Sequence, residues 1–119
     1  MANTRILQQK AFAFALDIVF FCKELDKRRE YVLSKQLLKS GTSIGANIEE
    51  AQQAESRKDF ISKYSISLKE AYETRYWLKI INKSVEGTEE KTTKLLSDVD
   101  EIIRILVVSI KTLKAGLKK

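Results

Sequence analysis

Two groups of Lys and Arg residues in this sequence are candidates for binding a negatively charged partner. Residues 102–119 contain five basic residues and no acidic one, and residues 27–29 form a second basic run. Lys and Arg contact phosphate groups, so both sets are candidate nucleic-acid contacts. At a net charge of +6, ordinary solubilising charge is the alternative. The candidates are Arg104, Lys111, Lys114, Lys118 and Lys119, with Lys27, Arg28 and Arg29.

Catalytic and metal chemistry find little support in the composition. The chain has no His, which removes the commonest general base and metal ligand. Its single cysteine, Cys22, lies in an apolar run, which excludes an internal disulfide and predicts a buried thiol. The carboxylates of Glu49, Glu50, Glu70 and Glu73 could form an acidic site, but pairing with nearby Lys or Arg is the simpler interpretation. We therefore predict no enzymatic activity, no metal and no cofactor.

Aromatic residues are mixed with basic ones in the third quarter of the chain. Tyr72, Tyr76 and Trp77 lie near four basic residues, Lys69, Arg75, Lys79 and Lys83. Aromatic rings among positive charges can stack on nucleic-acid bases. Burial in the core or in an interface is the alternative, and it is the commoner role of aromatics on a helix.

Helices must position these residues, because the chain has no Pro and only four Gly for turns. Apolar residues at three- and four-residue spacing predict four helices, over about residues 4–25, 32–54, 57–82 and 89–115. Ser56 and Asp59 have the form of a capping box at the third helix. Short connections require neighbouring helices to run antiparallel. The sequence predicts an all-α fold, an antiparallel up-down-up-down four-helix bundle, in one domain spanning residues 1–119.

The first and fourth helices carry more apolar residues than one bundle face needs. Exposed contiguous apolar surface is rare on monomers, so we expect a homo-oligomer. An unusually wide internal core is the alternative. The expected interface residues are Phe12, Leu16, Phe20, Ile102, Ile105 and Val108. The apolar run 11–22 is too short for a membrane span, and with no signal peptide evident we expect a cytoplasmic protein with no membrane partner.

Small residues gather in the middle of the second helix, over residues 41–51. Gly41 and Gly45 share a helix face, which permits close approach of another backbone at a cost of about 1 kcal/mol each in helix propensity. Tight packing is favoured over a ligand site, because no catalytic or metal partner completes one. Asn47 and Glu50 lie about one turn apart, and we expect a polar partner for them on the third helix, Glu70 or Arg75.

Three runs, residues 36–51, 56–61 and 68–78, resemble a known family. They contain Ser-Ile-x-x-Asn-Ile-x-Glu, beginning at Ser43, and Glu-Thr-x-Tyr-Trp-Leu, beginning at Glu73. In these patterns the chain is similar to the 23S rRNA intervening-sequence proteins, small bacterial four-helix bundles. The accessory protein of diversity-generating retroelements belongs to the same group. The family's motif positions fall on Ser43, Ile44, Asn47, Ile48, Glu50, Phe60, Glu70, Glu73 and Trp77.

The resemblance implies a homopentamer with a central channel and no enzyme activity. For the retroelement members it implies binding of nucleic acid and of a reverse transcriptase through a basic surface. The expected function is thus a non-enzymatic, oligomeric helical bundle that binds RNA, DNA or a nucleic-acid enzyme. A protein–protein assembly module without nucleic-acid contact is the alternative.

Overall fold

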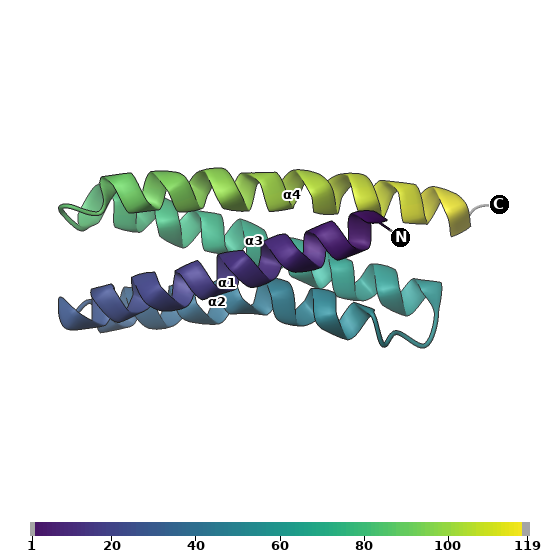
Figure 1. Ribbon diagram of the computed structural model, residues 1–119, viewed down its shortest axis with the longest axis horizontal. Helices are drawn as coiled ribbons and strands as arrows, with labels where there is room; N and C mark the ends of the chain where they lie inside the picture. The colour runs from purple at the N-terminus through teal and green to yellow at the C-terminus, as the bar shows by residue number, and fades with distance from the viewer. Residues whose placement is uncertain (1, 118–119) are drawn as a thin grey trace.

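The computed structural model describes the backbone of residues 2–117 and the side chains of residues 4–116. Four helices make up this range, with no strand among the described residues: α1 (Ala2–Lys27), α2 (Tyr31–Ala51), α3 (Arg57–Ser84) and α4 (Glu89–Leu117). They lie along one long axis in a body of 51 × 21 × 20 Å (Figure 1). The predicted all-α fold of four helices is confirmed.

Neighbouring helices close a four-sided arrangement. The helix backbones approach one another between α1 and α2, α2 and α3, α3 and α4, and α4 and α1, whereas within residues 2–117 the backbones of the diagonal pairs stay further apart. The α1–α2 and α3–α4 connections lie at one end of the bundle, and the α2–α3 connection lies at the other (Figure 1). Each helix therefore buries one stripe against two neighbours, the packing expected of a helical bundle.

Helix boundaries follow the local hydrogen bonds. Ser56 caps α3 as predicted, because its side chain accepts a 3.0 Å hydrogen bond from the Asp59 backbone N–H. The Asp59 carboxylate accepts from the Glu55 N–H at 3.2 Å, one residue before the expected position. The predicted end of the second helix at residue 54 was too late. Residues 52–54 make three-residue turns, so α2 ends at Ala51.

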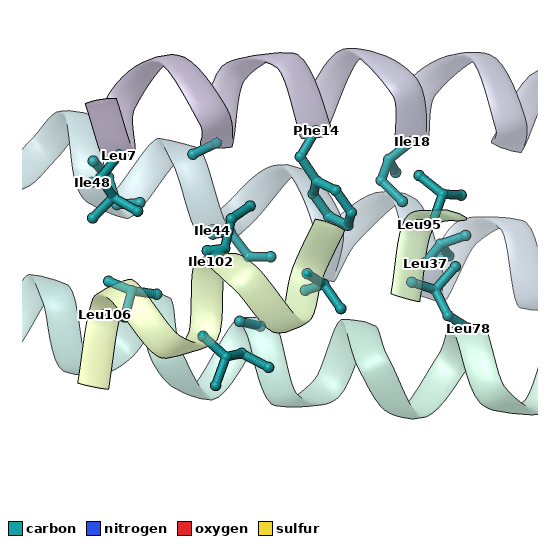
Figure 2. Packing of buried hydrophobic residues seen from close by; sticks show 14 of the residues in the cluster. Leu7, Phe14, Ile18, Leu37, Ile44, Ile48, Leu78, Leu95, Ile102 and Leu106 are labelled. Atoms are coloured by element: carbon teal, nitrogen blue, oxygen red, sulfur yellow. The ribbon is translucent and has the colours of Figure 1, made fainter. Parts of the chain in front are cut away.

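The core runs the length of the bundle between the four helices. In Figure 2, Leu7, Phe14 and Ile18 of α1 meet side chains of the other helices across the interior. Each fully buried side chain of this size contributes about 1.5–3 kcal/mol of hydrophobic stabilisation. The labelled partners are Leu37, Ile44 and Ile48 of α2, Leu78 of α3, and Leu95, Ile102 and Leu106 of α4.

The assignment of Ile102 to an oligomer interface was wrong. Its side chain is 1% exposed and lies in the core (Figure 2). Ile105, from the same set, is partly buried and packs against that core. The broad apolar face of α4 is directed inward here, because Ile102, Ile103 and Leu106 all reach the interior. For these residues the wide internal core was the better interpretation.

The two glycines of α2 lie against α1. A Cβ at Gly41 would lie 2.9 Å from Ile18 Cγ2, and a Cβ at Gly45 would lie 3.5 Å from Ala11 Cβ. The first distance is a clash and the second an ordinary contact. Tight packing is the right interpretation of this stretch, and its neighbour is α1.

Alanine substitutions at the two glycines should have opposite effects. Gly45→Ala is expected to stabilise the protein by up to about 1 kcal/mol, because alanine favours helix and the added methyl fits. Gly41→Ala should destabilise it by about 1 kcal/mol, because the clash with the buried Ile18 exceeds the propensity gain. Denaturant unfolding followed by circular dichroism measures both. Equal stabilisation by the two variants would contradict the close approach at Gly41.

One pair of buried polar side chains, Cys22 and Ser34, joins α1 to α2. The Cys22 thiol donates to the Ser34 carbonyl at 3.4 Å, and the Ser34 hydroxyl donates to the Cys22 carbonyl at 3.1 Å. Burial raises the pKa of Cys22 to about 11. The cysteine is therefore a neutral thiol at physiological pH, as its apolar surroundings in the sequence predicted.

Candidate nucleic-acid interface

The C-terminal half of α4 carries basic side chains that nearby acids do not balance. Arg104, Lys111 and Lys114 are all exposed. Arg104 and Lys111 are seven residues apart, so they share a face of the helix about 10 Å apart along its axis. Within residues 4–116 none of the three takes part in an ion pair. The predicted contacts Lys118 and Lys119 lie outside the described residues.

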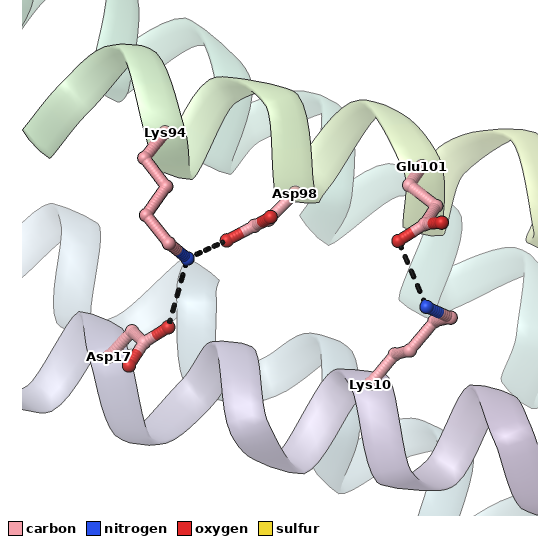
Figure 3. A network of polar contacts seen from close by, with 5 residues as sticks. All are labelled: Lys10, Asp17, Lys94, Asp98 and Glu101. Carbon is pink, nitrogen blue, oxygen red and sulfur yellow. Dashed lines mark hydrogen bonds and ion pairs between the residues drawn. The ribbon is translucent and has the colours of Figure 1, made fainter. Parts of the chain in front are cut away.

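The N-terminal half of α4 differs, because its lysines are paired across to α1. Lys94 Nζ lies 2.8 Å from Asp98 Oδ2 and 3.8 Å from Asp17 Oδ2, and Lys10 Nζ lies 3.1 Å from Glu101 Oε1 (Figure 3). The hydrogen bond to Asp98 raises the pKa of Lys94. Sequence reasoning missed this seam, although Asp17, the one charge in residues 11–22, was a signal for it. Because these ion pairs balance the charges of its N-terminal half, the unpaired positive charge of α4 lies in its C-terminal half.

The second basic run lies at the opposite end of the bundle. Lys27 is the last residue of α1, and Arg28 and Arg29 form the turn that follows. Arg28 donates a hydrogen bond to the carbonyl oxygen of Glu86, in the α3–α4 connection. Arg29 has a φ of 63°, the left-handed conformation that closes the corner before α2. Arg28 therefore joins two connections of the bundle, whatever else it contacts.

The structure does not bring the two basic sets together. Arg28 contacts the connection just before α4, and Lys111 lies more than 20 residues further along that helix. At 1.5 Å per residue this separation is about 35 Å. One phosphate run would have to extend along most of the bundle to contact both sets. The C-terminal half of α4 is thus the more coherent candidate surface within one chain.

Exposed apolar side chains remain on the outer face of α1. Phe12, Leu16 and Phe20 are 70%, 45% and 57% exposed and recur at four-residue spacing. Ile6, 45% exposed, was missed, although it precedes this series on the same helix. It lines a groove between α1 and α4 together with Arg104 and Val108, and Val108 is 63% exposed. The groove brings apolar and basic residues of the two predicted sets to one place.

Comparison with known proteins identifies the family of this chain. Residues 4–108 match the family model of the 23S rRNA-intervening sequence proteins. The chain belongs to this family. A crystal structure of a protein of unknown function from the S23 ribosomal protein family of Bacteroides thetaiotaomicron is 45% identical, with a TM-score of 0.88 over 92% of this chain and 98% of that one. No protein with curated function matches significantly.

On α2, the motif positions of the 23S rRNA-intervening sequence family have visible structural roles. Ile44 and Ile48 are fully buried in the core. Ser43 donates to the Lys39 carbonyl at 2.6 Å, and Asn47 donates to the Ser43 carbonyl at 2.8 Å, so both bond within their own helix. The expectation that Asn47 pairs with Glu70 or Arg75 was therefore wrong.

Glu50 pairs with a residue of α3, as expected, but this residue is Lys63 and not Arg75. Its carboxylate lies 3.1 Å from Lys63 Nζ. Arg75, the partner considered from the sequence, instead pairs with Asp100 of α4 at 3.2 Å. Sequence spacing identified the pair of helices but not the register between them.

On α3, the family positions divide between packing and surface hydrogen bonds. The Phe60 ring centroid lies 4.5 Å from that of the buried Tyr64 ring, with the two rings tilted by 39°. Trp77 packs against the core and donates its indole N–H to Glu73 at 3.1 Å. Glu70 is half-buried, and burial followed by the charge of Glu73 raises its pKa. These contacts explain the motif through folding alone.

Neither a metal site nor a membrane-spanning helix occurs among the described residues. Among the described residues, no three Cys, Asp or Glu side chains converge as a metal site would require. In that part of the chain, no helix is both long enough and apolar enough to cross a membrane.

Proposed function

We propose that this chain is a non-enzymatic, homo-oligomeric helical bundle of the cytoplasm that binds RNA or DNA through uncompensated basic side chains. The observation that carries the proposal is the charge asymmetry of α4. Lys94, in the N-terminal half of the helix, is paired with two acids. In contrast, Arg104, Lys111 and Lys114 are exposed, and none of them takes part in an ion pair among the described residues. Positive side chains that take part in no ion pair attract a polyanion.

The bundle that presents these residues is, in this proposal, antiparallel with up-down-up-down connections. Cross-helix pairs support this arrangement. Lys10 of α1 pairs with Glu101 of α4, and Asp17 pairs with Lys94, so the residue numbers rise along one helix and fall along the other. In such a bundle the second half of α4 lies beside the first half of α1, which carries the exposed apolar residues.

Self-association is part of the proposal because the exposed apolar face of α1 needs cover. Phe12, Leu16 and Phe20 form a continuous series there. A second copy of the chain is the partner that is always present, and closed rotational symmetry is its usual arrangement. The pentamer implied by the family resemblance would repeat the basic half of α4 five times and so multiply the phosphate contacts.

A salt titration tests nucleic-acid binding. Fluorescence anisotropy with labelled RNA and DNA should show binding near 50 mM salt, with the logarithm of affinity falling linearly with the logarithm of salt concentration. Three phosphate contacts per chain predict a slope of about −2 to −3 for each chain engaged. Absence of binding to either polymer at low salt would refute the proposal.

A protein–protein assembly module without nucleic-acid contact is the second candidate, and the apolar face of α1 favours it. For the retroelement members of the family, the resemblance implies a reverse transcriptase as a macromolecular partner. This alternative predicts that neutralising Lys111 and Lys114 leaves every partner interaction intact.

A further inference from the structure

The outer face of α3 carries a regular stripe of basic and aromatic residues. Lys69, Tyr72, Tyr76, Lys79 and Lys83 follow one another at spacings of three and four residues, which places them on one face of the helix. All five are exposed, and the two tyrosines are 43% and 59% exposed. The stripe is about 21 Å long at the helical rise. The core requires none of these side chains.

Neighbouring side chains hold the two tyrosine rings. The Arg75 guanidinium lies 5.1 Å from the centroid of the Tyr72 ring, and Asp100 of α4 holds Arg75 through a 3.2 Å ion pair. The Tyr76 ring meets Trp77 edge-on, with centroids 5.4 Å apart. Rings fixed in this way lose little conformational entropy when a ligand stacks on them. With the contacts to Arg75 and Trp77 in place, both tyrosine side chains are still exposed.

Two acidic residues beside the stripe have partners. Glu73 accepts the indole hydrogen bond of Trp77, and Asp100 pairs with Arg75. One turn beyond Asp100 on α4 is Arg104, which faces outward among the candidate phosphate contacts. The α3 stripe and the basic half of α4 are thus adjacent through the Arg75–Asp100 pair.

We propose that this α3 stripe binds an unpaired nucleic-acid strand, with Tyr72 and Tyr76 stacking on bases and the lysines contacting phosphates. Stacking and phosphate contacts read neither sugar nor sequence, so RNA and DNA single strands are bound alike. A duplex presents no free base faces, so it contacts only the basic side chains. The inference rests on the proposed nucleic-acid function and adds the form of nucleic acid that the surface selects.

Matched ligands separate stacking from charge. The probes are labelled single strands of roughly 12 nucleotides, within the span of known stacking modules, as RNA, as DNA and as an abasic strand of equal length, with a duplex beside them. The wild-type protein should bind both natural strands alike and bind the abasic strand at least about tenfold more weakly. The Tyr72→Leu/Tyr76→Leu variant should lose the same factor for single strands and none for the duplex.

Two further variants control this measurement. Tyr72→Phe/Tyr76→Phe keeps both rings and should stay within about twofold of the wild type. Glu73→Gln removes a negative charge beside the stripe while keeping an acceptor for Trp77, so it should strengthen binding to every ligand.

The outcomes distinguish this inference from the broader function. If the wild-type protein binds no nucleic acid, the proposed function itself fails. If it binds all four probes alike and the leucine variant matches it, phosphate binding stands and the stacking surface is refuted. A change of oligomeric state in the leucine variant, with unchanged affinity per chain, would instead make the stripe an interface between copies.

Discussion

Replacing Phe12, Leu16 and Phe20 together by glutamine should dissociate the assembled protein into monomers. Each side chain is exposed in the single chain, so its burial by another copy would contribute about 1.5–3 kcal/mol when complete. Losing all three from every protomer removes on the order of 5 kcal/mol per interface side. Glutamine is a good helix former, so α1 itself should persist. Sedimentation velocity or native mass spectrometry measures the outcome.

Folding of the monomer provides the internal control. Substitutions at exposed positions usually change stability by less than about 0.5 kcal/mol, so the glutamine variant should keep its helical circular dichroism. Val32→Gln, on α2, removes the most exposed large apolar side chain outside this face and should leave the assembly intact. An oligomer that survives the triple substitution would show that α1 is not its contact surface. A monomeric wild-type protein would refute the oligomer altogether.

The helices were predictable because the information that specifies them is local. Apolar spacing gives the helical stripe, and the absence of Pro removes the strongest helix breaker. The cap at Ser56 could be identified from two residues alone. The end of α2 was harder to predict, because the residue types at 52–54 are compatible with a helix. These residues form three-residue turns instead, and no turn-forming residue in the sequence indicates them.

The side-chain partners could not be predicted, because register between helices depends on packing of the whole bundle. The glycines of α2 indicated a close approach, yet only the bundle reveals that Ile18 and Ala11 of α1 occupy it. Ile102 was placed at an interface because its helix carries two apolar stripes. Which stripe faces inward depends on how α4 rotates against its neighbours, and periodicity along one helix does not determine this rotation.

The partners of surface side chains were equally hard to predict from the sequence. Charge counting located the basic end of α4, but the 3.8 Å ion pair between Lys94 and Asp17 joins residues 77 positions apart in the chain. The sequence grouped the three aromatic residues near Arg75, but it could not separate their roles. Trp77 turns toward the core while Tyr72 and Tyr76 remain outside, a difference that depends on the inward direction of α3.

Neutralising Arg104, Lys111 and Lys114 with glutamine should reduce nucleic-acid affinity on the order of a hundredfold near 50 mM salt. Loss of three phosphate contacts should also make the slope of log affinity against log salt concentration shallower by about 2–3 per chain. The three side chains are exposed and make no ion pair within the described residues, so the fold should be unaffected. Anisotropy titrations at several salt concentrations measure both quantities.

The chain offers a control with the same change in net charge. Lys10, Lys91 and Lys94 also lie on α1 and α4, but each is paired with a carboxylate, including Glu24 for Lys91. Their replacement by glutamine removes three positive charges and leaves those acids unpaired, at a stability cost that exposed pairs keep small, about 0–1 kcal/mol each. If binding follows local uncompensated charge, this variant should retain most of the affinity and nearly the full salt slope. Equal losses in the two variants would mean that net charge alone attracts the polyanion and that α4 forms no specific surface.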